Sequence, residues 1–309
     1  MQTPQLNQCA FIHLEQRDEL EVLAIEHPLF SAAIALQGAQ LLSFQPKGQP
    51  SKGQAPWIWL SPDSEYKAGQ SLRGGIPICW PWFGAANKNP NAVQQQITHI
   101  DNAPAHGFAR SINWQIDSVH ESCHEIRVVL SLSHNAESLS IWPFEFRVKA
   151  EFTLGRTLQV ALTTTNLSQR NMALTQALHT YYPSNDIGNV SIAGTANQTY
   201  TDALDRWQAF TQANTQVFNQ EVDRIFHTGG PFGFSVGDQN GTQRLTLTAE
   251  NSASTIIWNP WIEKAKRLSQ FADNAYQTMF CVETANALDD AQTLAPNATH
   301  RLSLMLARG

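Results

Sequence analysis

The segment FEFRVKAEFTLGRTLQVALTTTN, residues 144–166, alternates apolar and more polar side chains on both sides of Gly155. Successive side chains of a β-strand point to opposite faces, so a period of two predicts strands with one buried face. Gly155 and Arg156 interrupt the alternation after Leu154, and it resumes at Leu158. The segment therefore predicts a β-hairpin within an antiparallel sheet.

Three further segments show the same alternation. They are EIRVVLSLSH (125–134), QRLTLTAE (243–250) and the C-terminal HRLSLMLAR (300–308), which is expected to close a sheet. Asn240-Gly241 precedes the second segment and is a strong tight-turn pair. These strands extend the antiparallel pattern over the second half of the chain.

Helices are predicted to be few and short. SPDSEYK (61–67) and LSQFADNA (268–275) each resemble a single turn, and no regular alternation of strands with longer helices occurs. Two long polar segments, 85–104 and 185–221, are expected to be irregular rims around a site. The sequence predicts an all-β fold, an antiparallel sandwich or barrel, as a single domain over residues 1–309.

Composition narrows the class of protein. The 309 residues are 42% hydrophobic and 15% charged, so the chain can bury a sizeable core. The formal net charge is -6 and lysines and arginines form no run, which argues against a nucleic-acid partner. A single phosphate group remains a possible ligand, because two arginines can bind it inside an acidic protein.

The cysteines and the N-terminus indicate the compartment. Cys9, Cys79, Cys123 and Cys281 form no CxxC pair, which argues against a zinc site, a redox pair or a disulfide framework. No basic start followed by an apolar run and no stretch of about 18 apolar residues is present, so neither a signal peptide nor a membrane span is expected. We therefore expect a cytoplasmic protein with reduced thiols.

Residues 71–84, SLRGGIPICWPWFG, fit neither a helix nor a regular strand. Pro77 and a second proline at 81 fix φ, whereas Gly74 and Gly75 allow a turn or a close approach of the backbone. Arg73 stands at the start of this stiff corner. Flat aromatic faces that stack on a sugar ring, or else belong to the core, come from Trp57, Trp59, Trp80, Trp82 and Phe83.

Three short segments carry candidate acid, base and cationic groups. HGFAR contains His106 and Arg110, TQALHTYY places His179 in a strand-like environment, and FCVETAN contains Glu283. A strand histidine is either a satisfied structural residue or a catalyst near neutral pH. A buried carboxyl has a raised pKa, which suits a general base.

Together these motifs resemble a known family. RGGIPICWPWFG, HGFAR, ALHTYY, EVDRIF, WNPWIEK and CVETAN occur in this order between residues 73 and 286. They resemble the glucose-6-phosphate 1-epimerases, within the aldose 1-epimerase (galactose mutarotase-like) superfamily. The resemblance implies a large antiparallel β-sandwich with a few short helices and an active site in a cleft on the concave face of one sheet.

The resemblance also implies roles for single residues. His179 corresponds to the general acid and Glu283 to the general base, while Arg73 and Arg110 correspond to substrate contacts, chiefly to phosphate. Asp223 of EVDRIF corresponds to a ligand of a sugar hydroxyl, and His106 to a contact near the anomeric centre.

One position departs from the family pattern. Some relatives carry a glutamine before the HG pair, where this chain has Ala105, so one polar contact is either missing or supplied from elsewhere. Lys264, Lys266 and Arg267 add positive charge after the Asn259-Pro260 turn, but they are equally compatible with a solvated surface and are left out of the predicted site.

The implied reaction interconverts the α and β anomers of glucose 6-phosphate or a similar hexose 6-phosphate. A base removes the proton of the 1-hydroxyl while an acid protonates the ring oxygen, the ring opens, and closure reverses these roles. We expect no cofactor and no metal, a monomer, and a small phosphosugar as the partner. Two alternatives remain open: a mutarotase of unphosphorylated aldoses, and a non-catalytic carbohydrate-binding sandwich.

Overall fold

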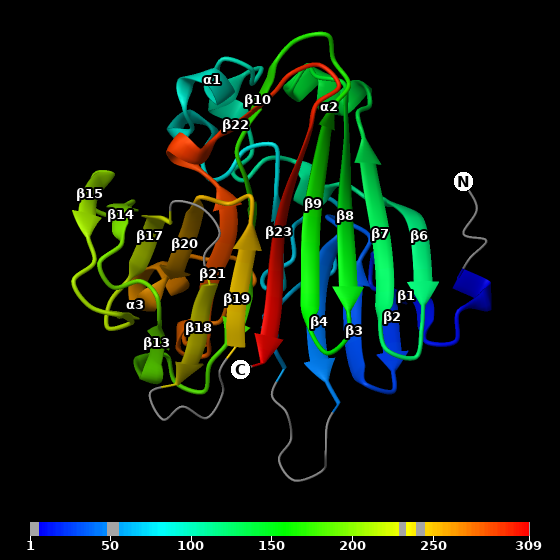
Figure 1. Ribbon diagram of the computed structural model, residues 1–309, viewed down its shortest axis with the longest axis horizontal. Helices are drawn as coiled ribbons and strands as arrows, with labels where there is room; N and C mark the ends of the chain where they lie inside the picture. The colour runs from blue at the N-terminus through cyan, green and yellow to red at the C-terminus, as the bar shows by residue number, and fades with distance from the viewer. Residues whose placement is uncertain (1–5, 48–55, 229–232, 239–244, 309) are drawn as a thin grey trace.

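The computed structural model describes residues 6–47, 56–228, 233–238 and 245–308, most of them in antiparallel β-strands (Figure 1). The described strands form two packed layers. One layer is a continuous nine-stranded sheet, and the other consists of a four-stranded and an eight-stranded sheet side by side. The prediction of an all-β sandwich with a few short helices is confirmed.

The nine-stranded sheet contains the hairpin that the sequence predicts. β8 and β9 pair from Leu154–Leu158 at the turn to Phe146–Asn166 at the open end. Every second side chain of β8 is buried, so the period of two separates core from surface. The strands in spatial order are β16 (Gln216–Val217), β13 (Val190–Ile192), β18 (Gly233–Asp238), β19 (Leu245–Glu250), β23 (Thr299–Arg308), β9 (Leu158–Asn166), β8 (Phe146–Leu154), β7 (Ile126–Ser133) and β6 (Gln115–Glu121).

The other three predicted strands also lie in this sheet. β7 covers the strand predicted at 125–134, and β19 covers the described part of 243–250. The turn predicted at Asn240-Gly241 lies outside the described residues. β23 pairs on one side with β19 and on the other with β9, so the C-terminal strand lies inside the sheet and does not close its edge.

The second layer begins with an N-terminal meander, in which β1 (Ile12–Arg17), β2 (Leu20–His27), β3 (Phe30–Ala35) and β4 (Gln40–Pro46) pair consecutively. A bridge between Leu41 and Ile76 joins it to the chain that leads into the eight-stranded sheet. That sheet runs in the order β15 (Gln208–Thr211), β14 (Thr199–Asp202), β17 (Val222–His227), β20 (Ser254–Asn259), β21 (Met279–Asn286), β11 (Gln176–Leu178) and β5 (Ile78–Cys79), and β12 (Tyr181–Pro183) also pairs with β21. A separate ribbon pairs β10 (Met172–Leu174) with β22 (Gln292–Leu294).

The helices are short, as predicted, but the sequence misplaces them. The α-helices of the described chain are α1 (Asn91–Gln94), α2 (Ala136–Ile141) and α3 (Trp261–Ala265). Residues 61–67 form no helix, and 268–275 is irregular except that its last residue begins a 3-10 helix. The two segments bind each other instead. Ser61 Oγ donates to the Gln270 carbonyl at 2.7 Å, and Gln270 Oε1 accepts from the Glu65 N–H at 3.1 Å. These contacts pair backbone groups that a helical turn would otherwise satisfy.

The two polar segments have different structures. Residues 85–104 contain α1 and two short 3-10 turns, which agrees with a loop. Residues 185–221 contain β13, β14, β15 and β16, so the prediction of an irregular loop is wrong there. β14 and β15 form a hairpin at the edge of the eight-stranded sheet, and all four residues of β15 are exposed. Because neither face of this edge strand is buried, its sequence lacks the alternation of apolar and polar residues that predicts a strand.

β21 separates two clusters of apolar side chains. All of its residues are buried. Phe280 and Val282 point into the main core between the layers, whereas Cys281 packs with Trp258 in a second cluster on the other face of the sheet. Glu283 is two residues from Cys281, so it lies on this second, outer face.

Two further observations concern the expectations from composition. No helix in the described part of the chain is long and apolar enough to cross a membrane. All four cysteines lie within the described ranges and are free of disulfides, with Cys79 and Cys281 buried and Cys123 exposed.

Candidate active site

The candidate site lies where β11 and β12 pair with β21. Leu178 pairs with Thr284 and Tyr181 with Cys281, and both pairs belong to one register. This register places His179, between the two short strands, opposite Glu283. Side chains directly opposite in an antiparallel pair have Cβ atoms about 5 Å apart, so the sheet itself brings these two groups together.

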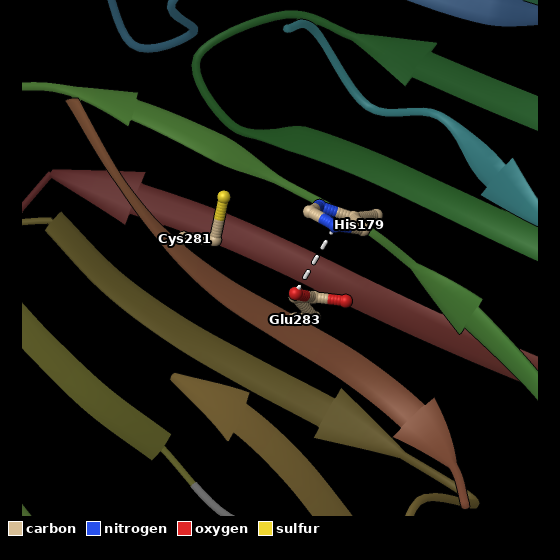
Figure 2. A group of neighbouring side chains, drawn as sticks. All are labelled: His179, Cys281 and Glu283. Carbon is tan, nitrogen blue, oxygen red and sulfur yellow. Dashed lines mark ion pairs between the residues drawn. The ribbon is translucent and has the colours of Figure 1, made fainter. Parts of the chain in front are cut away.

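The imidazole and the carboxyl are in contact. His179 Nε2 lies 3.4 Å from Glu283 Oε1, as the dashed line in Figure 2 marks. The side chain of Glu283 is 1% exposed and that of His179 11% exposed. Neither His179 Nδ1 nor Glu283 Oε2 has a hydrogen-bond partner among the described residues. The pair therefore retains polar atoms that are free to bind a ligand.

Burial dominates the electrostatics of this pair. It raises the pKa of Glu283 well above its usual value, and the charge of Asp223 adds to the increase. It lowers the pKa of His179 to about 3, with help from the positive charges of Arg110 and Arg73. Without a ligand, both directions favour a neutral carboxyl beside a neutral imidazole.

His179 opens onto a cavity of about 420 Å³, a volume typical of small-molecule sites. The cavity brings together four of the six predicted site residues, namely Arg73, His106, Arg110 and His179. Glu283 and Asp223 are not among the residues that line this cavity. The remaining lining residues are Gln70, Ser71, Leu72, Pro77, Tyr181, Ser269 and Gln270.

The two arginines hold no carboxylate. Neither guanidinium forms an ion pair with any acidic side chain that the structure describes. Arg73 Nε donates to the Ser269 carbonyl at 3.4 Å, and Arg110 Nη2 donates to the Ala105 carbonyl at 2.8 Å. Ala105 thus contributes a backbone contact to the site, although its side chain offers none. Most of the N–H groups on both guanidiniums remain available for an anion.

His106 is fixed in one tautomer by the corner that carries the tryptophans. Its Nδ1 accepts a hydrogen bond from the Gly84 N–H at 3.2 Å, so the neutral ring carries its proton on Nε2. Burial and the charge of Arg110 lower the pKa of His106 well below its usual value, which keeps the ring neutral. Gly107 has φ +70, and a Cβ there would lie 2.0 Å from the Trp80 carbonyl oxygen, so only glycine fits.

Asp223 stands two strands away from Cys281, because it pairs with Trp258 and Trp258 pairs with Cys281. Two strand spacings amount to about 10 Å. Lys264 Nζ lies 3.6 Å from Asp223 Oδ2 and 3.3 Å from Glu221 Oε1. Burial raises the pKa of Asp223 to about 6 even though Lys264 opposes the change.

Lys264 therefore pairs with a predicted site residue, Asp223, although it does not line the cavity. Its ammonium also lies 5.8 Å from the centre of the Trp258 ring. Lys266 and Arg267 are exposed, and Lys266 pairs with Glu263 on α3. These two cations behave as a solvated surface, one of the two interpretations that the sequence left open.

The aromatic residues of the corner are core rather than platforms. Trp57, Trp80 and Trp82 are at most 2% exposed and belong to the main hydrophobic cluster. Trp59 is 9% exposed and stacks on Tyr181 with ring centroids 5.8 Å apart. Phe83 is partly exposed and meets the edge of His106. These aromatic side chains thus pack near the site, and none of them lines the cavity.

Gly75 shows how the corner is held in place. Its φ is +70, and a Cβ there would lie 2.3 Å from the Leu41 carbonyl oxygen. The predicted close approach of the backbone is confirmed at this glycine. Its N–H donates to the Trp59 carbonyl, and its carbonyl accepts from the Tyr181 N–H, which ties the corner to β12.

Sequence reasoning missed three parts of the site. Tyr181 stacks on His179 with ring centroids 4.9 Å apart and planes 11° apart, and the TYY run was its only signal. Ser269 and Gln270 line the cavity from a segment predicted to be helical. Cys281 lies on the same face as Glu283, which the period of two along FCVETAN indicates. One ligand atom from each of His179, Cys281 and Glu283 lies within 4.8 Å of the others.

The fold is that of the galactose mutarotase-like proteins. The structure is similar to a solved "putative mutarotase (YeaD)" from Salmonella typhimurium, with a TM-score of 0.84 and 26% identity over 97% of this chain and 94% of that one. It also shares its fold with a galactose mutarotase-like protein from Lactobacillus casei ATCC 334, with a TM-score of 0.68 and 18% identity over 93% of this chain and 100% of that one.

The chain belongs to the aldose 1-epimerase family, whose sequence model matches residues 21–307. It is 31% identical over 284 residues to a protein of Escherichia coli K12 named "Putative glucose-6-phosphate 1-epimerase", covering 92% of this chain and 89% of that one. A protein of Cenchrus ciliaris with the same name is 32% identical over 287 residues, covering 89% and 80%. The family resemblance drawn from the motifs is confirmed.

Proposed function

We propose that this protein interconverts the α and β anomers of a hexose 6-phosphate, with glucose 6-phosphate as the leading substrate. One observation carries the proposal. The cavity that exposes His179, in contact with Glu283, also contains two guanidinium groups without a carboxylate partner among the described residues. The proposed acid and the proposed phosphate-binding groups line one cavity of sugar size, and the proposed base contacts the acid.

The phosphate would bind between Arg73 and Arg110. Guanidinium groups match the oxygens of a phosphate dianion in pairs, and such charged hydrogen bonds are about twice as strong as neutral ones. The backbone carbonyls of Ser269 and Ala105 hold the two side chains at the cavity wall. Phosphate binding would then orient the sugar so that C1 reaches the acid/base pair.

Ring opening requires two proton transfers at neighbouring atoms. Glu283 takes the proton from the 1-hydroxyl while His179 donates a proton to the ring oxygen, and the bond between C1 and the ring oxygen breaks. Both oxygens are bonded to C1, so two groups only 3.4 Å apart can reach them together. Rotation about the C1–C2 bond and the reverse transfers then give the other anomer.

The environment strengthens both groups for these roles. A carboxylate whose pKa is raised is a stronger base, and an imidazolium whose pKa is lowered is a stronger acid. The active form needs the proton on His179 rather than on Glu283. A bound phosphate dianion offsets the positive charges of Arg73 and Arg110 that disfavour the imidazolium, so substrate binding itself promotes this form.

The remaining polar groups would position the sugar. Neutral His106 lines the cavity and carries its proton on Nε2, so it can donate to a hydroxyl near C1. Asp223, about two strand spacings from Cys281, can accept from a hydroxyl on the far side of the ring. Lys264 holds this carboxylate in place at 3.6 Å.

Magnetisation-transfer NMR of the glucose 6-phosphate anomers, with and without the protein, tests the proposal. We expect faster exchange for glucose 6-phosphate and much less acceleration for glucose. Equal acceleration of both sugars would favour a mutarotase of free aldoses, and saturable binding without acceleration would favour a binding module. Either result would overturn the proposal.

A further inference from the structure

We propose that His179, Cys281 and Glu283 form a binding site for a thiophilic divalent cation such as Zn²⁺, and that the cation excludes the sugar from the acid/base pair. The binding part stands on the geometry of these three side chains alone. The inhibition part rests on the function proposed above.

The spacing of the donor atoms is close to that of a zinc site. The three ligand atoms lie within 4.8 Å of one another, and His179 Nε2 is already 3.4 Å from Glu283 Oε1. Two ligands of a tetrahedral zinc with bonds of about 2.0 to 2.3 Å are separated by about 3.3 to 3.8 Å. Small side-chain rotations, without movement of the strands, would close the remaining gap to Cys281.

The sheet supplies the site in a rigid form. Cys281 and Glu283 project from the same face of β21, and His179 approaches from the neighbouring segment between β11 and β12, as Figure 2 shows. Cys281 and Glu283 are almost completely buried. Glu283 Oε2 lacks a hydrogen-bond partner among the described residues, so a buried acceptor is available beside the cluster. A preformed donor set lowers the cost of ordering ligands around a cation.

The donor types select the metal. Imidazole, thiolate and carboxylate are the three side-chain ligands of zinc, and the thiolate disfavours Mg²⁺ and Ca²⁺. Three protein ligands leave a fourth position for water, as in open zinc sites. This position would be supplied from the cavity, which His179 lines.

Binding exchanges two protons for the metal. The Cys281 S–H bond and the Glu283 O–H bond break, both protons pass to solvent, and the sulfur and the carboxylate form the bonds to Zn²⁺. His179 binds as the neutral imidazole, so affinity rises with pH. The two anionic ligands balance the charge of the cation. The positive charges of Arg73 and Arg110 at the cavity predict weaker binding than at a dedicated structural zinc site.

The consequence for catalysis follows from the shared atoms. A cation on His179 Nε2 and Glu283 Oε1 occupies the atoms that would transfer protons to and from the sugar. Zn²⁺ should therefore inhibit anomer exchange competitively with the sugar, and a chelator should restore the rate. Mg²⁺ at the same concentration should have no effect.

Titration of the full chain with Co²⁺ and Zn²⁺ tests the site directly. We expect one equivalent of Co²⁺ to give a thiolate-to-cobalt charge-transfer band and the intense visible bands of a tetrahedral ion, and Zn²⁺ to displace it. Cys281→Ser should abolish the charge-transfer band and weaken Zn²⁺ binding by at least about 10- to 100-fold, the loss seen even for outer-shell partners of a metal. Cys79→Ser, which removes another buried thiol, should bind as the unchanged protein does.

Glu283→Gln serves as the second variant if Cys281→Ser does not fold, and it should also weaken Zn²⁺ binding. Absence of the charge-transfer band, or equal Zn²⁺ affinity in the unchanged protein and in the folded variant, would overturn the site. The spectra require no turnover, so they remain decisive even if the protein does not act on hexose phosphates. If the metal binds but anomer exchange is present and unaffected, the inhibition part is wrong.

Discussion

The nine-stranded sheet presents one apolar face to the core and a more polar face to solvent, whereas the eight-stranded sheet is buried on both faces along β21. The difference extends to hydrogen bonding. Among the strands of the nine-stranded sheet other than β18, none contains a buried side-chain polar atom without a partner in the described part of the chain. Around β11, β12 and β21 five side chains have such an atom, namely Gln176, His179, Tyr182, Glu283 and Thr284.

The comparison indicates that one sheet contributes mainly to stability and the other mainly to the proposed activity. A buried polar group without a partner costs about 1 to 3 kcal/mol, so the eight-stranded sheet gives up stability that the apolar packing of the other sheet supplies. Two of these five side chains, His179 and Glu283, are the ones that the proposed function uses. Changes in one sheet should therefore alter activity, and changes in the other should alter stability.

Glu283→Gln should have the largest effect. Loss of the proposed base should lower the rate of anomer exchange by about 10²- to 10⁴-fold. The free energy of unfolding should stay equal or rise, because an amide is neutral without the proton that the Glu283 carboxyl must take up when it is buried. NMR exchange and urea unfolding measure the two quantities. Glu263→Gln on α3, an exposed glutamate, is the matched control. A Glu283→Gln variant that keeps more than a tenth of the rate would remove the base from the mechanism.

Leu162→Ala should show the opposite behaviour. Leu162 lies on β9 and is completely buried in the core. Removing its side chain should lower the free energy of unfolding by about 2 to 5 kcal/mol. The rate per folded molecule should not change, because Leu162 belongs to the main core and does not line the cavity. Urea unfolding and exchange rates on the same sample give both values, and a rate that falls as steeply as in Glu283→Gln would contradict the division between the sheets.

Arg110→Ala should separate the phosphosugar from the free sugar. Loss of a charge-assisted contact worth about 1.5 to 3 kcal/mol should reduce kcat/KM for glucose 6-phosphate by about 10- to 100-fold. Any slow exchange of glucose should be nearly unchanged. Arg267→Ala, on the exposed surface, is the control. Equal losses on both sugars would make Arg110 a structural residue.

Asp223→Asn, a substitution in the eight-stranded sheet, should change how the free energy of unfolding depends on pH. The folded protein raises the pKa of Asp223 from 3.8 to about 6, so folding favours the protonated carboxyl. The unchanged protein should therefore lose stability relative to Asp223→Asn as pH rises from about 4 to about 6, by at most about 3 kcal/mol, and no further above that. Urea unfolding at several pH values measures the difference. A difference that does not vary with pH in this window would show that the pKa is not raised.

Local patterns predicted the regular parts of the fold. The alternation in 144–166 gave both strands of the β8–β9 hairpin, and the motifs identified the family. The same reasoning misread 185–221 because an exposed edge hairpin has a polar sequence. It placed helices at 61–67 and 268–275, where long-range hydrogen bonds between the two segments take the place of helical turns.

The sequence by itself determined the alternating strands, the identity of the acidic, basic and cationic groups, and the family. Only the tertiary structure decided that His179 stands opposite Glu283, that Cys281 joins them, that Arg73 and Arg110 face one cavity, and that Trp80 and Trp82 are core. The physical reason is the distance along the sequence over which each feature is determined. Side-chain periodicity depends on neighbours a few residues apart, whereas the contact of residues more than a hundred positions apart depends on the register of a whole sheet.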